Sequence, residues 1–215
     1  MTECEIAGER LVLLAERAAY WPARKTLFVA DFHLGKAASF RAAGIPLPSG
    51  TTSENVERLG RAIDRTGARH VVFLGDFLHS AEGRAARTLE RFGVWRAQRH
   101  SVALTVVRGN HDRKAGDPPG EWDVACIEEG EALGPFVLNH EPRPSAAGYA
   151  LAGHIHPAVR LSGDGDDSLR LPCFWFGKRH GVLPAFGAFT GSAVVRPRPG
   201  DRVFVIAEEE VVRVA

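Results

Sequence analysis

The chain has 215 residues, of which 45% are hydrophobic and 25% charged, and this composition excludes a disordered or collagen-like chain. Lysine plus arginine total 27 and aspartate plus glutamate total 26, so the net charge of +1 indicates no particular partner. Three scattered cysteines exclude a disulfide framework and a CxxC zinc site, and no apolar run approaches the roughly 20 residues of a membrane span. We therefore expect one domain over residues 1–215 in the cytoplasm, without a membrane anchor.

In the first half of the chain, short apolar runs alternate with amphipathic stretches. Strands are expected at residues 10–14, 26–30, 70–74 and 102–107, because these runs are continuous and partly β-branched. Helices are expected at residues 53–66, with Ser53 as the N-cap, and at residues 85–99. This alternation is typical of parallel strands joined by helices.

In the second half, strand patterns dominate. Short strands are expected at residues 136–139 and 149–152, and closing strands at 203–206 and 211–214. Residues 158–161 and 169–174 are expected to form a hairpin around a turn at 163–167. Because helical periodicity stops near Pro157, we expect a second sheet within the same domain, and therefore an α/β fold with a mixed sheet.

Residues that commonly ligate metals follow five of the predicted strands. They are Asp31, His33, Asp76, Asn110, His111, Asp112, His140, His154 and His156. Ligands collect beyond the carboxyl ends of strands in open α/β sheets, so these distant segments are expected to meet in one crevice. Imidazole, carboxylate and amide donors without a thiolate suit manganese, iron or zinc.

The spacing of these residues also points to a metal centre. In Asp31-x-His33 an extended segment would direct both side chains to the same side, and His154-x-His156 has the same period. Two cations roughly 3.5–4 Å apart need a bridging carboxylate. Asp76 is the expected bridge, because the preceding glycine allows a close approach of the backbone.

The motifs DxH, GD, GNHD, a lone His and GHxH occur in this order between Asp31 and His156. On these five blocks the sequence resembles the calcineurin-like metallophosphoesterase superfamily. The context of the blocks is also similar, nearly end to end, to the small bacterial ligase-associated DNA-damage-response metallophosphoesterases. Two positions, Phe32 and Ser192, depart from the pattern of that group, and neither is a ligand position.

The resemblance implies a fold, a metal centre and a reaction. The fold would be a sandwich of two mixed β-sheets flanked by helices. Asp31, His33, Asp76 and His156 would hold one divalent ion, and Asp76, Asn110, His140 and His154 a second; Mn²⁺ is the expected ion, with Fe and Zn as alternatives. His111 would protonate the leaving oxygen, Asp112 would orient its ring, and activated water would attack phosphorus in line.

The resemblance further implies a phosphodiesterase that acts on DNA as a nuclease in bacterial repair, with a DNA ligase, a helicase and an exonuclease-like protein as partners. A phosphomonoesterase or small-nucleotide hydrolase using the same site is the alternative, and a non-catalytic scaffold is the third. Candidate substrate contacts are Asn110, Lys36, Arg41, Arg113 and His79. For the arginines between residues 84 and 99 there are two interpretations, a solvated helix face, which is favoured, and a face that follows the phosphates of a nucleic acid.

Overall fold

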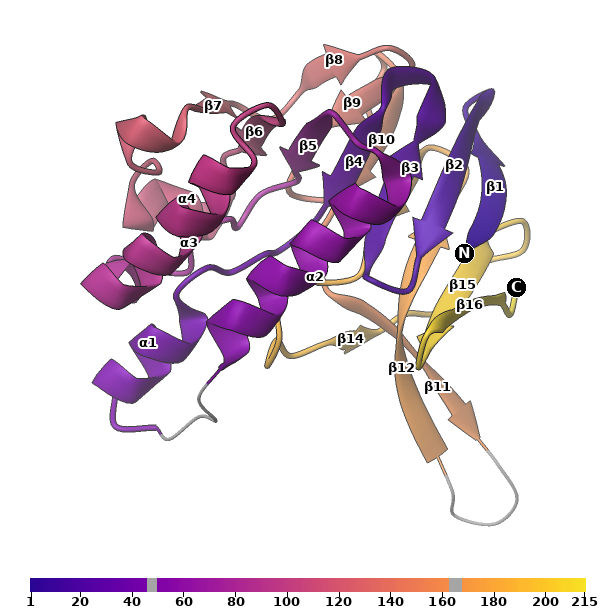
Figure 1. The fold of residues 1–215 in the computed structure, drawn as a ribbon. Helices are drawn as coiled ribbons and strands as arrows, with labels where there is room; N and C mark the ends of the chain where they lie inside the picture. Colours follow the sequence, from indigo (N-terminus) through magenta and orange to yellow (C-terminus); the bar gives the residue numbers. More distant parts are fainter. Residues whose placement is uncertain (46–49, 163–167) are drawn as a thin grey trace.

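Two β-sheets stacked face to face form the centre of the structure, with helices covering the outer face of the first sheet (Figure 1). The computed structural model describes residues 1–45, 50–162 and 168–215. The turn predicted at residues 163–167 lies outside the described residues. Among the described segments, no helix is both long and apolar enough to cross a membrane.

The first sheet contains seven strands that lie side by side in chain order. They are β1 (Thr2–Ile6), β2 (Glu9–Leu14), β3 (Ala18–Trp21), β4 (Thr26–Val29), β5 (His70–Phe73), β6 (Ala103–Val107) and β7 (Val124–Ile127). Strands β1 to β4 pair antiparallel, and β4 to β7 pair parallel. The carboxyl ends of β4, β5 and β6 therefore open at the same edge.

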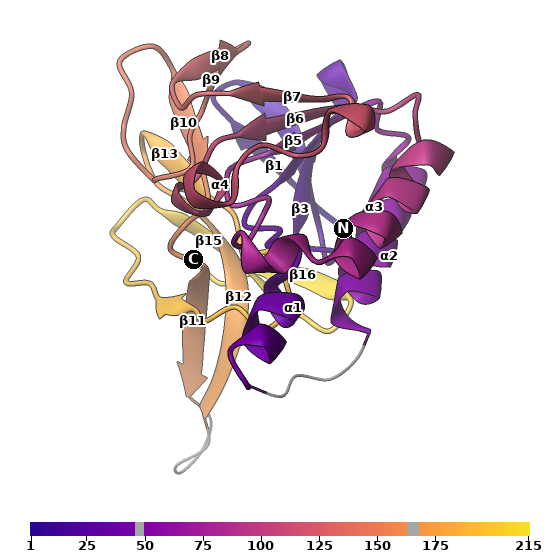
Figure 2. The same ribbon diagram turned by 90° about the vertical axis from the view of Figure 1, so that its left-hand side faces the viewer.

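Helices join the parallel strands of the first sheet. They are α1 (Lys36–Ala42) and α2 (Thr51–Thr66) between β4 and β5, α3 (Ala86–Gln98) between β5 and β6, and α4 (Asn110–Ala115) after β6. Short 3-10 turns are η1 (Pro22–Arg24), η2 (Glu82–Arg84) and η3 (Gly120–Trp122). Figure 2 shows α2 and α3 on one side of the first sheet and the strands of the second sheet on the other.

The second sheet takes up the rest of the chain. Its strands are β8 (Glu131–Leu133), β9 (Phe136–Leu138), β10 (Tyr149–Ala152), β11 (Pro157–Ser162), β12 (Ser168–Phe176), β13 (His180–Val182), β14 (Ala193–Val194), β15 (Arg202–Ala207) and β16 (Glu210–Arg213). Strand β10 pairs parallel with both β9 and β13, whereas β11 and β12 form an antiparallel hairpin. The expected mixed second sheet is therefore confirmed.

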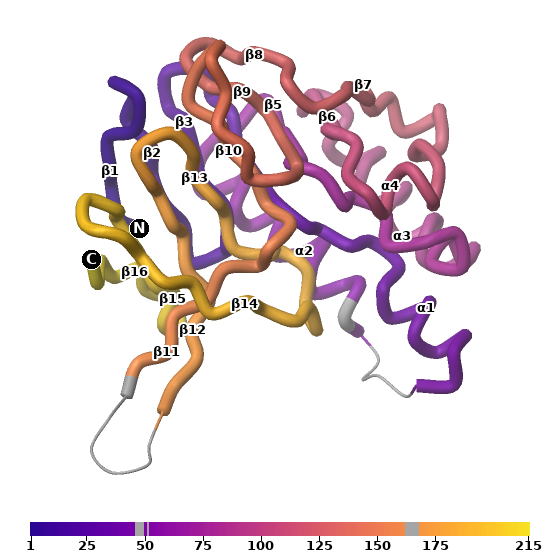
Figure 3. The backbone as a smooth tube through the Cα atoms, turned by 180° about the vertical axis from the view of Figure 1, so that it is seen from behind, coloured from indigo at the N-terminus to yellow at the C-terminus, as the bar shows by residue number. Residues whose placement is uncertain are grey.

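Alternation along the central strands builds two cores. In β4, Leu27 and Val29 face the helices, whereas Phe28 faces the second sheet. In β5, Val71 and Val72 divide between the same two cores. Since both faces of these strands are buried, their sequences read as continuous apolar runs. The first strand, β1, and the last, β16, lie toward the same side of the molecule (Figure 3), where the hydroxyl of Thr2 donates to the carbonyl of Val211 at 2.5 Å.

The structure corrects several predicted details. Helix α2 begins at Thr51 after Gly50, so the prediction of Ser53 as its N-cap is wrong. The sequence does not predict strands β1, β3, β7, β8, β13 and β14 or the short helices α1 and α4. Three of these elements, β7, β8 and β1, show part-exposed or mixed burial, and this weakens the apolar signal by which a strand is recognised.

Candidate metal centre

The predicted ligands lie at neighbouring strand ends of both sheets. Asp31 and His33 follow β4, Asp76 follows β5, and Asn110 follows β6 in the first sheet. In the second sheet His140 follows β9, and His154 and His156 follow β10. The segments are joined by backbone hydrogen bonds, such as that from His33 N–H to the carbonyl of Asp76 at 2.9 Å. The carboxyl ends of strands from both sheets thus face one crevice.

The first group of donors consists of Asp31, His33 and His156. One ligating atom from each lies within 4.8 Å of the other two. Nε2 of His156 is 3.5 Å from Oδ1 of Asp31, and Nε2 of His33 is 3.9 Å from Oδ2 of Asp76. The Nε2 atom of His33 is buried and has no hydrogen-bond partner among the described residues. A buried imidazole nitrogen without a partner fits a ligand whose lone pair is directed at a cation.

The second group consists of Asp76, His140 and His154, again with one atom of each within 4.8 Å of the others. Nε2 of His140 lies 2.9 Å from Oδ1 of Asn110, 3.0 Å from Nδ1 of His154 and 3.4 Å from Oδ1 of Asp76. Four donors therefore converge on one point. Asp76 reaches toward both groups, as a bridging carboxylate must.

Backbone groups orient the ligand side chains. Nδ1 of His140 lies 3.2 Å from the carbonyl of Leu74, and Nδ1 of His156 lies 2.8 Å from that of Gly191. A proton on each Nδ1 donates to the carbonyl and leaves Nε2 as the ligating atom, which is the usual arrangement around metal-binding histidines. In addition, His154 N–H donates to the carboxylate of Asp31 at 2.9 Å. The donor set and its orientation fit two divalent cations.

Five of the seven predicted ligands have left-handed backbones, and this corrects the expected extended geometry. Asp31, His33, Asp76, His154 and His156 have φ values between +49° and +72°. Such conformations cost about 1–2 kcal/mol for a non-glycine residue, although Asp and His tolerate them better than most. In the pairs Asp31/His33 and His154/His156, the two side chains therefore converge through sharp turns at the strand ends. Backbone strain of this kind commonly marks a functional site.

Two glycines allow the groups to approach each other. A Cβ at Gly75 would lie 2.2 Å from Nδ1 of His140, and one at Gly109 would lie 2.3 Å from Oδ1 of Asp76. Real Cβ atoms do not make such contacts, so any side chain here would displace a ligand. The close approach predicted at Gly75 is confirmed, and it serves the ring of His140.

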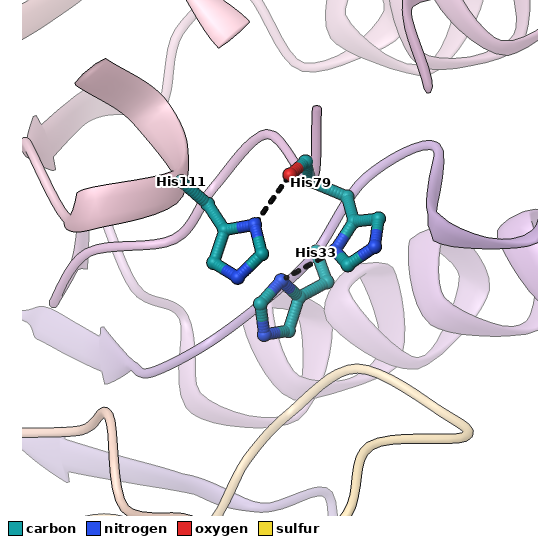
Figure 4. A group of neighbouring side chains, drawn as sticks. All are labelled: His33, His79 and His111. Carbon is teal, nitrogen blue, oxygen red and sulfur yellow. Dashed lines mark hydrogen bonds between the residues drawn. The ribbon is translucent and has the colours of Figure 1, made fainter. Parts of the chain in front are cut away.

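Two further histidines, His79 and His111, lie together with the predicted ligand His33 (Figure 4). The rings of His79 and His111 stack with centroids 4.8 Å apart, and Nδ1 of His79 is 3.2 Å from Nδ1 of His33. Nδ1 of His111 lies 2.5 Å from the carbonyl of His79, and its Nε2 lies 3.9 Å from Oδ2 of Asp76. The ring of His111 is therefore held with Nε2 directed toward the crevice.

The structure does not place Asp112 against the ring of His111. Its buried carboxylate accepts hydrogen bonds from the N–H groups of Phe77, Leu78 and Gly109. The contact that orients the ring comes from the carbonyl of His79 instead. Asp112 affects the ring of His111 indirectly, because its hydrogen bonds hold the segment that carries the carbonyl of His79. The predicted direct role of Asp112 is corrected accordingly.

Burial controls the charge of the ionisable groups in the crevice. It lowers the pKa of His33 well below its ordinary value, which keeps that ring neutral and able to coordinate. Burial, reinforced by the charges of Lys36 and His111, lowers the pKa of His79 to about 4. Burial also raises the pKa of Asp76, and His140 opposes that shift. Two divalent cations against two carboxylates would leave the crevice with a net charge of about +2.

The remaining candidate residues separate into two groups. Lys36 and His79 lie at the crevice: burial lowers the pKa of Lys36, and the nearby carboxylates of Asp31 and Asp76 oppose that shift. Arg41 lies on α1, outside the donor groups, and lines a separate pocket. Arg113 forms an ion pair with Glu128 at 2.6 Å rather than joining the ligands. Sequence reasoning also missed the carbonyls that orient the rings, because a backbone group leaves no signal in residue type.

Comparisons with known proteins agree with this geometry. The family model for calcineurin-like phosphoesterases matches residues 24–156. The crystal structure of Pseudomonas putida nuclease MPE is 39% identical, covers 99% of both chains and superposes with a TM-score of 0.88. YfcE, a phosphoesterase from E. coli, is 15% identical over 88% of this chain and 98% of its own, with a TM-score of 0.44. No curated protein sequence matches the chain.

The family match spans every block that carries a candidate ligand, from Asp31 to His156. Members of this family use divalent metal ions, and the two donor groups provide places for them. The chain therefore belongs to the calcineurin-like phosphoesterase family and is a metal-dependent hydrolase of phosphoester bonds.

Proposed function

We propose that the chain is a dinuclear metal-dependent phosphodiesterase that cleaves DNA. The observation that carries this proposal is the convergence of two donor groups on Asp76, with Nε2 of His111 beside the same carboxylate. A site for two cations next to a proton donor suits the displacement of an ester oxygen from phosphorus. The similarity to a nuclease of known structure supports a nucleic-acid substrate.

Two sets of residues would hold the cations. Asp31, His33, Asp76 and His156 form one set, and Asp76, Asn110, His140 and His154 form the other. Such ions would polarise a phosphoryl oxygen and would lower the pKa of bound water, so that a nucleophile is available at neutral pH. We propose Mn²⁺ as the resident ion, since a mixture of carboxylate, amide and imidazole donors without thiolate suits it; Fe and Zn are the alternatives.

The proton for the leaving group would come from His111. Its Nδ1–H donates to the carbonyl of His79, and this contact fixes the direction of the ring. Nε2 then carries the proton toward the ester oxygen that leaves. Asp112 maintains the carbonyl of His79 in place through its bonds to the preceding N–H groups. A positioned histidine acid contributes typically about 10²- to 10⁴-fold to such reactions.

Substrate contacts are proposed for the polar groups around this acid. Lys36 is half-buried at the start of α1 and places a cation beside the crevice. The neutral ring of His79 and the side-chain amide of Asn110 can donate hydrogen bonds to phosphate oxygens. We assign the enzyme to the cytoplasm and to DNA repair, beside a ligase, a helicase and an exonuclease-like protein, on the resemblance of its sequence to repair-associated members of the family.

The proposal is tested by substrate comparison with added Mn²⁺. Purified protein is expected to hydrolyse a bis-aryl phosphodiester and a DNA oligonucleotide faster than an aryl phosphomonoester. Asp76→Asn should reduce all of these rates to background, whereas Asp64→Asn, which changes only a surface ion pair with Arg99, should leave them unchanged. Faster monoester hydrolysis would instead support the phosphomonoesterase alternative. Activity retained in Asp76→Asn would refute the assigned centre.

A further inference from the structure

A basic pocket lies between α1 and the amino-terminal ends of α2 and α3. Figure 1 labels the three helices that line it. Its volume is about 510 Å³. Arg41 enters it from α1, and Arg87 and Arg91 enter it from α3. The described residues that line it include these three arginines and no carboxylate. Such a pocket favours an anionic ligand.

The structure separates the arginines of residues 84–99 by role. Arg84 donates to the carbonyl of Asp117, and buried Arg96 donates to those of Trp122 and Val102. Arg99 forms an ion pair with Asp64. These three are therefore engaged in holding the fold together.

The other two arginines of this stretch are exposed and face the pocket. Arg87 and Arg91 are four residues apart on α3, so they project from the same face of the helix. The interpretation of the whole stretch as a solvated helix face is therefore incomplete. Two of its members form, with Arg41, a concave basic surface.

The two helix ends at this pocket add to its positive potential. Helix α2 begins after Gly50 and α3 after Ala85, and neither N-cap residue makes a side-chain hydrogen bond to its helix. The first N–H groups of an uncapped helix carry partial positive charge. Arginine side chains grip phosphate oxygens in a paired, planar geometry. The arginines supply the recognition, and the helix ends strengthen it.

The pocket and the candidate metal centre are built on the same two segments of the chain. Arg41 lies eight residues after His33, and Arg87 lies eight residues after His79. Between them, the hydroxyl oxygens of Ser39 and Ser80 are 2.7 Å apart. Arg41 thus lies on the helix that begins at Lys36, directly after the segment of His33.

We propose that this pocket binds a backbone phosphate of the nucleic-acid strand whose scissile phosphodiester lies at the metal centre. The inference rests on the proposed function and extends it, because it adds a second anchor for a polymeric substrate. A free phosphate or mononucleotide offers the same chemistry. The strand is favoured because the pocket and the crevice lie on consecutive segments, with Lys36 between them.

The test uses Arg87→Gln/Arg91→Gln in the full-length protein. Glutamine preserves helix propensity and side-chain length while removing the charge. The matched control is Arg24→Gln/Arg69→Gln, which removes two exposed arginines at the amino ends of β4 and β5, the edge opposite the crevice. For each protein we would measure kinetics on a bis-aryl phosphodiester and on a DNA oligonucleotide. Binding of the oligonucleotide would be measured with chelator present, as a function of salt.

We expect the pocket variant to hydrolyse the bis-aryl diester at the rate of the control, while its KM for DNA rises about tenfold, as the removal of charged hydrogen bonds predicts. The salt dependence of oligonucleotide binding should flatten by about 0.7 for each phosphate that the variant no longer neutralises. An unchanged KM and salt slope would overturn the proposal. The proposal would also be overturned if the two arginines were required for binding inorganic phosphate but not for binding DNA.

The failure of the proposed function looks different. If the wild type cleaves the bis-aryl diester but not DNA, the substrate assignment is wrong. Oligonucleotide binding with chelator present then still judges the pocket, since it requires no turnover. Loss of binding in the pocket variant alone supports the anchor, and equal binding by all three proteins refutes it.

Discussion

A methyl group added at Gly75 tests whether the packing of the crevice determines metal binding. Gly75 has a φ of +80°, and a Cβ there would lie 2.2 Å from Nδ1 of His140. Gly8, in the turn between β1 and β2, has a φ of +79° with nothing within 4 Å of its Cβ position. Alanine therefore imposes the same backbone penalty at both sites, about 1–2 kcal/mol. Only Gly75→Ala also displaces a ligand.

The two variants should differ in both stability and activity. Overpacking adds about 1–3 kcal/mol at Gly75. At about 2–4 °C per kcal/mol for a chain of this size, Gly8→Ala should lower Tm by about 2–8 °C and Gly75→Ala by about 4–20 °C. Displacing His140 also breaks its contacts with Leu74 and Asn110, and a misplacement of about 1 Å can cost about 100-fold in rate.

The assays are thermal unfolding, calorimetric titration with Mn²⁺, and hydrolysis of a bis-aryl phosphodiester. Gly8→Ala should bind as many Mn²⁺ ions as the wild type and should hydrolyse the bis-aryl phosphodiester at the wild-type rate. Gly75→Ala should bind fewer ions and lose about 100-fold in rate even at temperatures where it is fully folded. Wild-type stoichiometry and rate in Gly75→Ala would refute the reasoning, because the crevice would then tolerate the added atom.

Four further outcomes are expected. His111→Asn should slow DNA hydrolysis by about 10²- to 10⁴-fold but bis-aryl hydrolysis less, because an aryl oxide leaves without a proton; equal losses would contradict the acid role. Asp112→Asn should lower the free energy of unfolding in urea by about 1.5–3 kcal/mol, since it weakens charged hydrogen bonds to three N–H groups, and an unchanged value would show that they contribute little. A chelator should lower Tm, because a cation at a hundred times its Kd stabilises the fold by about 2.7 kcal/mol; a Tm that is indifferent to metal would argue against the centre. Burial raises the pKa of the Cys4 and Cys126 thiols from 9 to about 11, so stability present below pH 9 should fall as the pH rises toward 11, and a constant urea midpoint would rule this out.

The residues of the candidate centre lie together, as expected from the sequence, and the two-sheet fold is also as expected, whereas several short elements escaped prediction. Buried strands such as β4 and β5 carry a strong apolar signal, and the residue that follows each was correctly expected at one edge. The short strand β8 and helix α4 escaped notice, because three to six residues with mixed burial carry little periodicity.

Other features depend on contacts that local sequence does not encode. The left-handed backbone of His33 is imposed by bonds between the segments after β4 and β5. The Asp112 carboxylate accepts from the N–H groups of Phe77 and Leu78, which are more than thirty residues away in the sequence, and from the nearby N–H of Gly109. The basic pocket joins α1 and α3 and becomes visible only when both helices are placed.

The left-handed ligands set catalysis against thermal robustness. At each of these five positions glycine would relax the backbone, so exchanging a ligand such as the exposed His154 for glycine should strengthen the metal-free fold while destroying the centre. A library of variants selected for heat resistance with a chelator present would therefore drift toward inactive, glycine-bearing sequences. Only selection for activity retains the ligands, so a search for more thermostable variants should assay hydrolysis in every round.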